Sequence, residues 1–253
     1  MPLYSTACPL PVNRKIFRRK ASSAPFSPTD IGGISVWLKA DAGVTISGGL
    51  VTGWADQSGN GANCSSPNVV LFYSSPYPYI YFGGPDTESE ITLHPDVFND
   101  SSALSFFAVW RITNGDNNGV IGTPTYSNFE ITTGYNEATD SNDSAVRMRN
   151  DNYDASINIG GWWNDQEFSL STLAIDSSDK SGTMRLNGSA SGVNFTPINS
   201  EALQAGQTYK IGVYGGGYFA EISLAELIVY SEKLNSSQIS QVETYLNSKY
   251  AIY

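Results

Sequence analysis

The sequence has few cysteine and histidine residues, which form disulfides, ligate zinc and serve in catalytic triads. It contains two cysteines and one histidine among 253 residues. Cys8 falls in the N-terminal segment and Cys64 in a turn rich in Gly and Asn, so we expect no disulfide framework. The scarcity also excludes a zinc site built from Cys and His, and His94 is the one residue around which a Ser/His/Asp triad could form. We therefore expect no metal site and no cofactor.

Long hydrophobic runs are missing as well. No stretch of apolar residues approaches the length needed to cross a bilayer, so we expect no membrane partner. Within the first twenty residues, Pro9, Pro11 and the polar segment 13–15 interrupt any apolar run that could serve as a secretion signal. We expect synthesis in a reducing compartment, without a cleavable signal.

Charged residues make up 15% of the chain, whereas aromatic residues reach 12% and glycine occurs 24 times. This composition is typical of many short strands joined by tight turns. β-Sandwiches and jelly rolls commonly occupy roughly 200 to 250 residues as one unit. We therefore expect one main domain.

The charge is unevenly distributed along the chain. Residues 1–29 carry five basic residues and no acidic one, so residues 30–253 carry nine basic against twenty-four acidic residues, a net charge of −15. The N-terminal segment shows no sustained hydrophobic period and contains five prolines, which predicts an extended arm. The predicted organisation is a basic docking arm, residues 1–29, followed by an acidic body, residues 30–253.

The arm combines positive charge with an aromatic anchor. Such a segment is suited to an acidic protein surface, where its charges speed encounter and its apolar residues slow release. An acidic body of net charge −15 repels nucleic acid, so we expect a protein partner and no nucleic acid, and self-association stays open. The predicted docking residues are Arg14, Lys15, Phe17, Arg18, Arg19 and Lys20.

The body reads as a series of short strands. In the strongest of them, residues 104–112, alternate residues share one face: Leu104, Phe106, Ala108, Trp110 and Ile112. Further short strands follow, most of them ended within a few residues by Asn, Asp, Gly or Ser. This succession of short strands and turns, without helices between them, predicts antiparallel sheets in a two-layer sandwich. Residues 76–85, rich in aromatics, Pro and Gly, are expected to be irregular strand and loop.

The final part of the body predicts a strand followed by a helix. Residues 219–230 are β-branched and aromatic, and they are bounded by glycines and a polar turn. Asn235 with Gln238 three residues later forms a capping-box pattern. Apolar residues then recur at helical spacing. The apolar face of this helix is expected to lie on a sheet; it comprises Ile239, Val242, Tyr245, Leu246 and Tyr250.

The two ends of the body carry a resemblance to a known family. Residues 35–43 (SVWLKADAG) and 51–61 (VTGWADQSGNG) are similar to the opening of concanavalin A-like, laminin G-type jelly-roll domains, and residues 225–250 are similar to their closing strand and helix. The resemblance implies an all-β, two-layer antiparallel jelly-roll sandwich. The family includes lectins, glycan hydrolases, adhesion modules and bacteriophage virion proteins, so fold alone does not define function.

One pair of acidic residues suggests catalysis. Glycan hydrolases of the laminarinase type place two glutamates around an aspartate on one strand, and Glu221 and Glu226 flank Ser223 in this sequence. Strict alternation would put the two glutamates on opposite faces of the strand unless a β-bulge intervenes. Because the aspartate is missing, we expect a structural strand and no enzymatic activity.

Binding of carbohydrate is the more general possibility. Sugar rings present an apolar face and a rim of hydroxyls, which aromatic residues beside amides and carboxylates can bind. The glycan-binding candidates are Tyr153, Trp162, Trp163 and Tyr218. Asp56 and the residues up to Gly61 have oxygen-bearing side chains at alternate positions, but turn formation explains them better than calcium binding.

These observations favour a non-enzymatic structural protein of a virion, such as a capsid decoration, fibre or tail component. It would be anchored to other virion proteins by its arm and would display a lectin-like sandwich to cell-surface glycans. One alternative is a cellular carbohydrate-binding or adhesion module, for which a secretion signal would be expected. The other is a laminarinase-type hydrolase, which would be favoured if the two glutamates shared an open cleft.

Overall fold

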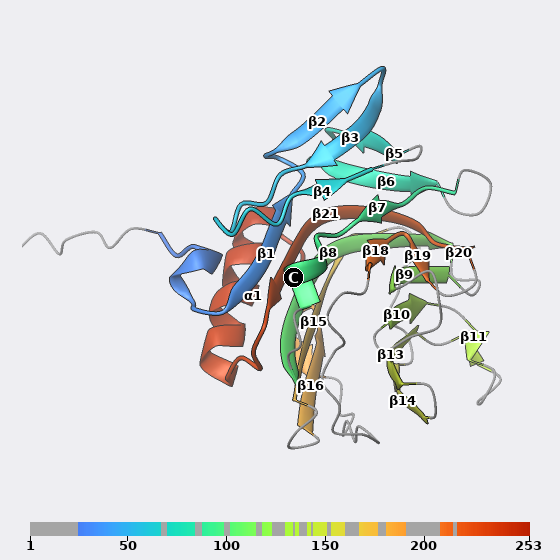
Figure 1. The fold of residues 1–253 in the computed structure, drawn as a ribbon. Helices are drawn as coiled ribbons and strands as arrows, with labels where there is room; N and C mark the ends of the chain where they lie inside the picture. The colour runs from blue at the N-terminus through green and yellow to red at the C-terminus, as the bar shows by residue number, and fades with distance from the viewer. Residues whose placement is uncertain are drawn as a thin grey trace, which may run out of the picture.

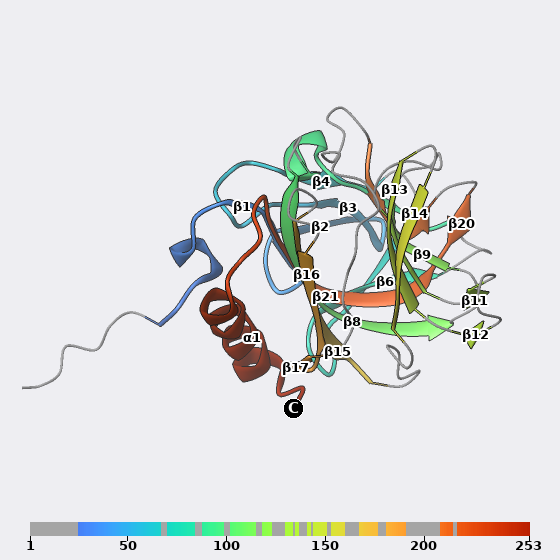
Figure 2. The ribbon, with the colours of Figure 1, turned by 90° about the horizontal axis from the view of Figure 1, so that it is seen from below.

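The chain folds into two stacked antiparallel β-sheets with an α-helix on the outer face of one of them (Figures 1 and 2). This all-β sandwich closed by a C-terminal helix is the predicted fold class. The computed structural model describes residues 25–66, 70–83, 88–98, 102–114, 118–122, 130–133, 135–136, 141–142, 144–150, 153–159, 167–176, 181–190, 208–214 and 217–253.

Sheet A has eight strands in the described residues. Seven of them follow one another in a linear order, and the eighth, β1 (Ile34–Lys39), pairs with β21 only. The other strands of sheet A, in spatial order, are β17 (Ser189–Ala190), β16 (Ser181–Leu186), β15 (Ser169–Asp176), β8 (Ala103–Asn114), β21 (Glu221–Tyr230), β6 (Tyr79–Gly83) and β5 (Val70–Tyr73).

Sheet B has nine strands in the same described residues. In spatial order they are β14 (Tyr153–Ile159), β13 (Ser144–Asn150), β10 (Glu130–Thr133), β9 (Asn118–Gly122), β18 (Lys210–Ile211), β7 (Ile91–Thr92), β4 (Cys64–Ser65), β3 (Leu50–Trp54) and β2 (Val44–Ser47). Two short ribbons pair β11 (Tyr135–Asn136) with β12 (Ser141–Asn142), and β19 (Val213–Tyr214) with β20 (Tyr218–Phe219). The 3-10 helices are η1 (Pro28–Asp30) and η2 (Pro95–Phe98).

The main core lies between the two sheets. On β8, Leu104, Phe106, Ala108 and Trp110 all enter this core, as the alternation in the sequence predicts. The indole Nε1 of Trp110 donates to the Oγ of Ser171 at 2.9 Å, so its polar atom is satisfied within the core. The opposite face of β8, with Phe107 and Val109, packs in a second core beneath the helix.

Strand β21 lies in the middle of sheet A and divides one of its edges between two partners. Its first half pairs with β6, from Glu221 to Leu224, and its second half pairs with β1, from Glu226 to Tyr230. Its other edge pairs along its length with β8, where the register shifts between Leu224 and Glu226. This bulge leaves Ala225 without a partner residue on β8, and it changes which side chains face the helix.

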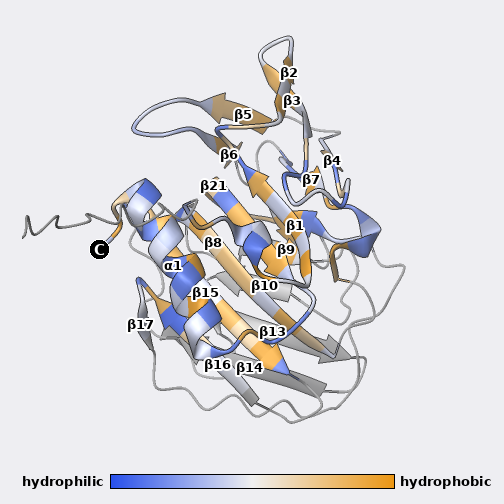
Figure 3. Ribbon diagram, turned by 90° about the vertical axis from the view of Figure 1, so that its left-hand side faces the viewer, coloured by the Kyte–Doolittle hydropathy of each residue, from blue (hydrophilic) through white to orange (hydrophobic). Residues whose placement is uncertain are grey.

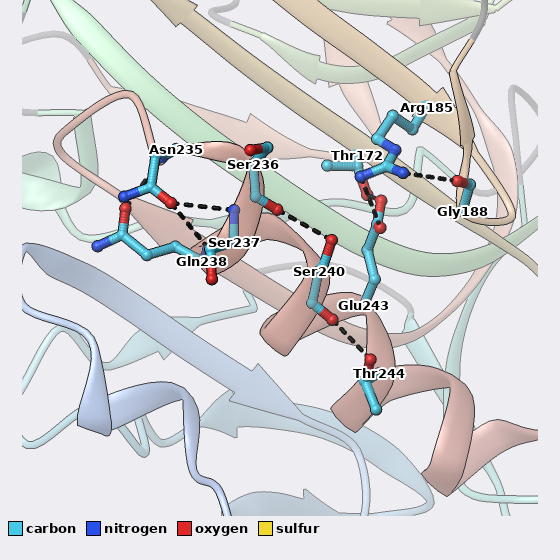
Figure 4. A network of polar contacts seen from close by, with 10 residues as sticks. All are labelled: Thr172, Arg185, Gly188, Asn235, Ser236, Ser237, Gln238, Ser240, Glu243 and Thr244. Atoms are coloured by element: carbon cyan, nitrogen blue, oxygen red, sulfur yellow. Dashed lines mark hydrogen bonds and ion pairs between the residues drawn. The ribbon is translucent and has the colours of Figure 1, made fainter.

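Helix α1 (Ser236–Tyr250) begins at the predicted capping box. The side chain of Asn235 accepts from the backbone of Ser237 and Gln238, and the side chain of Gln238 accepts from the backbone N–H of Asn235 (Figure 4). The helix lies across β8 and β15 with its hydrophilic residues turned outward (Figure 3). Its buried residues are Ile239, Val242, Glu243, Leu246 and Tyr250.

A polar contact fastens the middle of the helix to sheet A. Buried Glu243 accepts from the hydroxyl of Thr172 on β15 at 2.9 Å and pairs with Arg185 on β16 at 3.1 Å (Figure 4). The pKa of the Glu243 carboxyl is raised overall, because the effect of burial exceeds the opposing effects of the hydrogen bond from Thr172 and the charge of Arg185.

Two local predictions were wrong. Cys64 is not in a turn: it begins β4, is 5% exposed, and burial raises the pKa of its thiol to about 12. Residues 76–85 contain β6, a regular strand in which Ile80 and Phe82 enter the core. Both errors arose because Gly, Pro and Asn nearby suggest turns, whereas pairing with distant strands decides the structure.

The residues next to the predicted arm boundary contact the body. The ring of Phe26 meets that of Tyr245 on α1 edge to face, with 6.3 Å between centroids. Ser27 caps η1 in a capping box with Asp30, and the hydroxyl of Tyr230 donates to the carbonyl of Pro28 at 2.9 Å. The predicted docking residues, 14–20, lie outside the described residues.

Candidate functional site

A group of tyrosines lies on the outer face of sheet A beside the helix. Ile80 and Phe82 point into the core, so Tyr79 and Tyr81 lie on the opposite face of β6. The register places Tyr73 of β5 directly across from Tyr79, and their rings stack with centroids 5.1 Å apart. Tyr73 also meets the edge of Tyr81 and is 42% exposed. These rings form a partly exposed aromatic platform.

Arg111 stands at the end of this platform. Pairing across β6, β21 and β8 aligns Tyr81, Ser223 and Arg111 in one row. The guanidinium lies near two rings, 5.8 Å from the centroid of Tyr79 and 5.4 Å from that of Phe168. Its Nη2 donates to the Oγ of Ser223 at 3.2 Å. Arg111 is thus oriented by aromatic contacts and one neutral hydrogen bond.

Arg111 has unused hydrogen-bonding capacity. Its Nε is buried and has no hydrogen-bond partner. In the part of the chain that the structure describes, its guanidinium forms no ion pair with a carboxylate. A cation without a counter-ion beside a partly exposed platform can bind an external acceptor.

Glu221 borders the same surface. The hydroxyl of Tyr81 donates to its Oε1 at 2.8 Å. Burial, and then this hydrogen bond, raise the pKa of Tyr81 to about 12, so the hydroxyl stays protonated and keeps donating. A carboxylate, a guanidinium and an aromatic platform together suit a polyhydroxylated ring. We call this set the Arg111 surface; it comprises Tyr73, Tyr79, Tyr81, Arg111, Phe168 and Glu221.

Glu226 has a different environment from Glu221. The β21 bulge breaks the alternation, so Glu226 turns toward α1 and is 0% exposed. Its Oε1 accepts from the Nε1 of Trp37 at 2.6 Å and from the hydroxyl of Tyr245 at 3.0 Å. Its Oε2 accepts from the Nζ of Lys249 at 2.7 Å and from the hydroxyl of Tyr250 at 2.8 Å.

These four donors make Glu226 an anchor for the helix. Lys249 also pairs with Asp41 at 3.0 Å, which links the end of α1 to the segment after β1. Burial, and then the charge of Glu226, raise the pKa of Tyr245 and of Tyr250, so both hydroxyls remain protonated donors. Because Glu226 is enclosed, it shares no open cleft with Glu221, and the arrangement required of a laminarinase-type pair is not formed.

The Asp56 loop is held by the chain's own donors. The Asp56 carboxylate accepts from the backbone of Trp37, Ser58 and Ala62, and from the hydroxyl of Ser58 at 2.6 Å. Burial opposes ionisation, yet these hydrogen bonds together keep the pKa of Asp56 below its usual value. This is the predicted turn chemistry. Across the described ranges, no group of three or more His, Cys, Asp or Glu residues could hold a metal ion.

The two predicted glycan-binding residues that the structure describes lie in elements other than those of the Arg111 surface. Tyr153 begins β14 at one edge of sheet B, and Tyr218 lies in β20, within the β19–β20 ribbon. Trp162 and Trp163 lie outside the described residues. The role of these four residues in glycan binding stays a prediction. No helix within the described ranges has the length and hydrophobicity that a membrane span requires.

Sequence reasoning missed the Arg111 surface, although two signals were available. Tyr77, Tyr79 and Tyr81 recur at a spacing of two, which places them on one face of an extended strand. Arg111 is the single charged residue in the apolar run 104–112. A charge in a central strand requires a specific environment on one face of the sheet.

The described residues thus form a two-layer β-sandwich with an arginine-centred aromatic surface on the helix side. No protein-family model and no curated protein sequence matches the chain. Solved β-sandwich structures resemble it in fold. The binding domain of Paraclostridial Mosquitocidal Protein 1 matches with a TM-score of 0.64 and 14% identity, over 87% of this chain and 54% of that one.

Two further structures show the range of these similarities. The binding domain of botulinum neurotoxin serotype G matches with a TM-score of 0.63 and 16% identity, over 85% of this chain and 51% of that one. Domain 4 of AbnA, a GH43 extracellular arabinanase from Geobacillus stearothermophilus, was solved in complex with arabinotriose. It matches with a TM-score of 0.62 and 13% identity, over 83% of this chain and 98% of that one.

The matched share of the neighbour's own length differs between the toxin binding domains and the arabinanase domain. This chain spans about half the length of the toxin binding domains, 54% and 51% of the two above, but nearly the whole of the arabinanase domain, 98%. At identities of 13 to 16%, the similarities establish the fold.

Proposed function

We propose that this chain is a non-enzymatic carbohydrate-binding module and that the Arg111 surface is its binding site. The observation that carries the proposal is the exposed ring of Tyr73, stacked on the buried ring of Tyr79, which lies next to the guanidinium of Arg111. A pyranose or furanose ring can lie on such a platform while its hydroxyls meet the guanidinium and the carboxylate of Glu221.

The arabinanase domain supports this proposal more directly than the toxins do. It is matched over 98% of its length, so the domain solved with arabinotriose corresponds as a whole to this fold. One neurotoxin binding domain was solved in complex with SialylT, but this chain covers 52% of it, so that complex supports the proposal less directly. The Arg111 surface itself is therefore the main support.

Replacing Tyr73 by alanine is expected to weaken saccharide binding about tenfold or more, because it removes the most exposed ring of the platform. Dissociation constants for a panel of neutral and acidic oligosaccharides, measured by calorimetry, test this. Tyr253→Ala is the matched control, since Tyr253 is an exposed tyrosine, at 55%, outside the surface. Equal affinities of the two variants would place the binding site elsewhere, and a parent that binds no saccharide would refute the function.

We further propose that the module is a bacteriophage virion component, such as a capsid decoration, fibre or tail protein. The support is the charge distribution: five basic residues in residues 1–29 precede a body of net charge −15. Such an arm can hold the module on acidic sites of other virion proteins while the sandwich is displayed. A cellular adhesion module remains the alternative, and localisation of the protein in purified particles distinguishes the two.

Deleting residues 1–24 is expected to leave a cooperatively folded body with a free energy of unfolding within about 0.5 kcal/mol of the parent. The reason is that residues 1–24 contain no periodic apolar segment, and the deletion keeps the described contacts of Phe26 and the capping box of Ser27 and Asp30. Urea unfolding measures this. A molten or insoluble product would show that the arm belongs to the core, which would refute the division into arm and body.

A further inference from the structure

Among the described residues, Arg111 has no counter-ion, a feature that it shares with Lys39 on β1 and that sets it apart from three other half-buried cations. Arg185 pairs with Glu243, Lys210 with Glu90, and Lys249 with both Glu226 and Asp41. Arg111 instead contacts two rings and the neutral hydroxyl of Ser223. Its buried Nε has no hydrogen-bond partner, as is also true of the Nε of Arg185. The positive charge is therefore only partly compensated within the described chain.

The position of this charge restricts the ligand that could compensate it. The guanidinium is planar and can bind a carboxylate through two parallel hydrogen bonds. Next to it lies the stacked pair of Tyr73 and Tyr79, which suits the apolar face of a sugar ring. A ring that carries its own carboxylate could occupy both features at once.

The surrounding charge argues against a polyanion. Glu221 lies on the rim of the surface, and residues 30–253 carry a net charge of −15. A highly charged nucleic acid or sulfated chain would be repelled by this field. A ligand with one carboxylate at the recognised residue matches the single uncompensated guanidinium.

We propose that the Arg111 surface is selective for acidic saccharides, those whose recognised residue carries one carboxylate, such as a sialic or uronic acid. This inference rests on the proposed carbohydrate-binding function and specifies its ligand class. The sugar ring packs on the exposed ring of Tyr73, which is itself stacked on Tyr79, and its carboxylate binds Arg111, which Ser223 and the ring of Phe168 hold in position.

The test compares acidic saccharides with their neutral counterparts. The full-length protein is titrated with sialyllactose and with lactose, and in parallel with trigalacturonate and its fully methyl-esterified form. We expect at least one acidic ligand to bind about tenfold or more tightly than its neutral counterpart, and the pair that shows this effect separates sialic from uronic acid. The methyl ester of sialyllactose, which lacks the charge, should bind like lactose.

Protein variants assign the effect to Arg111. Arg111→Gln removes the charge and is expected to abolish the preference for the acidic ligand, whereas Arg111→Lys keeps a charge without the planar fork and should retain a reduced preference. Lys39→Gln is the matched control, because Lys39 also lies over an aromatic ring, that of Trp37 at 4.5 Å, but on β1. It should bind like the parent. Urea unfolding verifies that each variant is folded.

The possible outcomes separate the inference from the function on which it rests. Equal binding of acidic and neutral ligands by the parent would overturn the inference and leave the carbohydrate-binding function standing. A preference that survives in Arg111→Gln would overturn the assignment to Arg111. Should the Gln variant fail to fold, the ester comparison on the parent decides alone. Binding of heparin or DNA in preference to every saccharide, or binding of no saccharide, would overturn the proposed function as well.

Discussion

Replacing Glu226 by alanine is expected to lower the free energy of unfolding by about 3 to 5 kcal/mol, because it removes one partner of a buried charge pair. The change leaves the ammonium of Lys249 without its buried counter-ion, and it leaves the Nε1 of Trp37 and the hydroxyls of Tyr245 and Tyr250 without their acceptor. Chemical denaturation followed by tryptophan fluorescence measures the loss.

Glu221→Ala is the matched control for this prediction. It removes a glutamate from the same strand, but one that accepts a hydrogen bond from Tyr81 at a partly exposed site. Its cost should be about 1 kcal/mol. Combining Glu226→Leu with Lys249→Met should recover part of the loss, since both charges are then removed. If Glu226→Ala costs no more than Glu221→Ala, Glu226 does not anchor the helix.

Replacing Leu246 by alanine is expected to cost about 2 to 5 kcal/mol, through lost burial and the cavity left behind. Leu246 is 0% exposed and packs in the core between α1 and sheet A. Ser248→Ala, at an exposed position on the same helix, is the control and should change stability by about 0.5 kcal/mol or less. The midpoint of urea unfolding distinguishes them. Similar values for both variants would mean that the helix is not docked on the sheet.

The local sequence pattern was sufficient to predict the elements that have a strong hydrophobic periodicity. The capping box at Asn235 and the apolar face of α1 were predicted because both depend on residues three or four apart. The inward face of β8 was predicted because alternation within a strand is a local property. The resemblance of both ends of the body to jelly-roll domains agreed with the observed sandwich.

Pattern was not sufficient for features that depend on pairing between distant strands. The bulge at Ala225 arises from the register of β21 against β8, and it decides that Glu226 faces α1. The Arg111 surface requires β5, β6, β21 and β8 to align Tyr73, Tyr81 and Arg111, which are distant in sequence. The tyrosine spacing and the single charge of Arg111 are visible in the sequence, but the pairing that brings these residues together is visible only in the folded sheet.

The divided edge of β21 has a consequence for how the protein is made. β21 separates β8 from both β1 and β6, so none of these three earlier strands has its central partner until residues 221–230 have left the ribosome. Until then their edges are open to pairing with other chains. Among the described strands β21 is the last to be translated, so sheet A closes late and its open edges are exposed to neighbouring nascent chains until then.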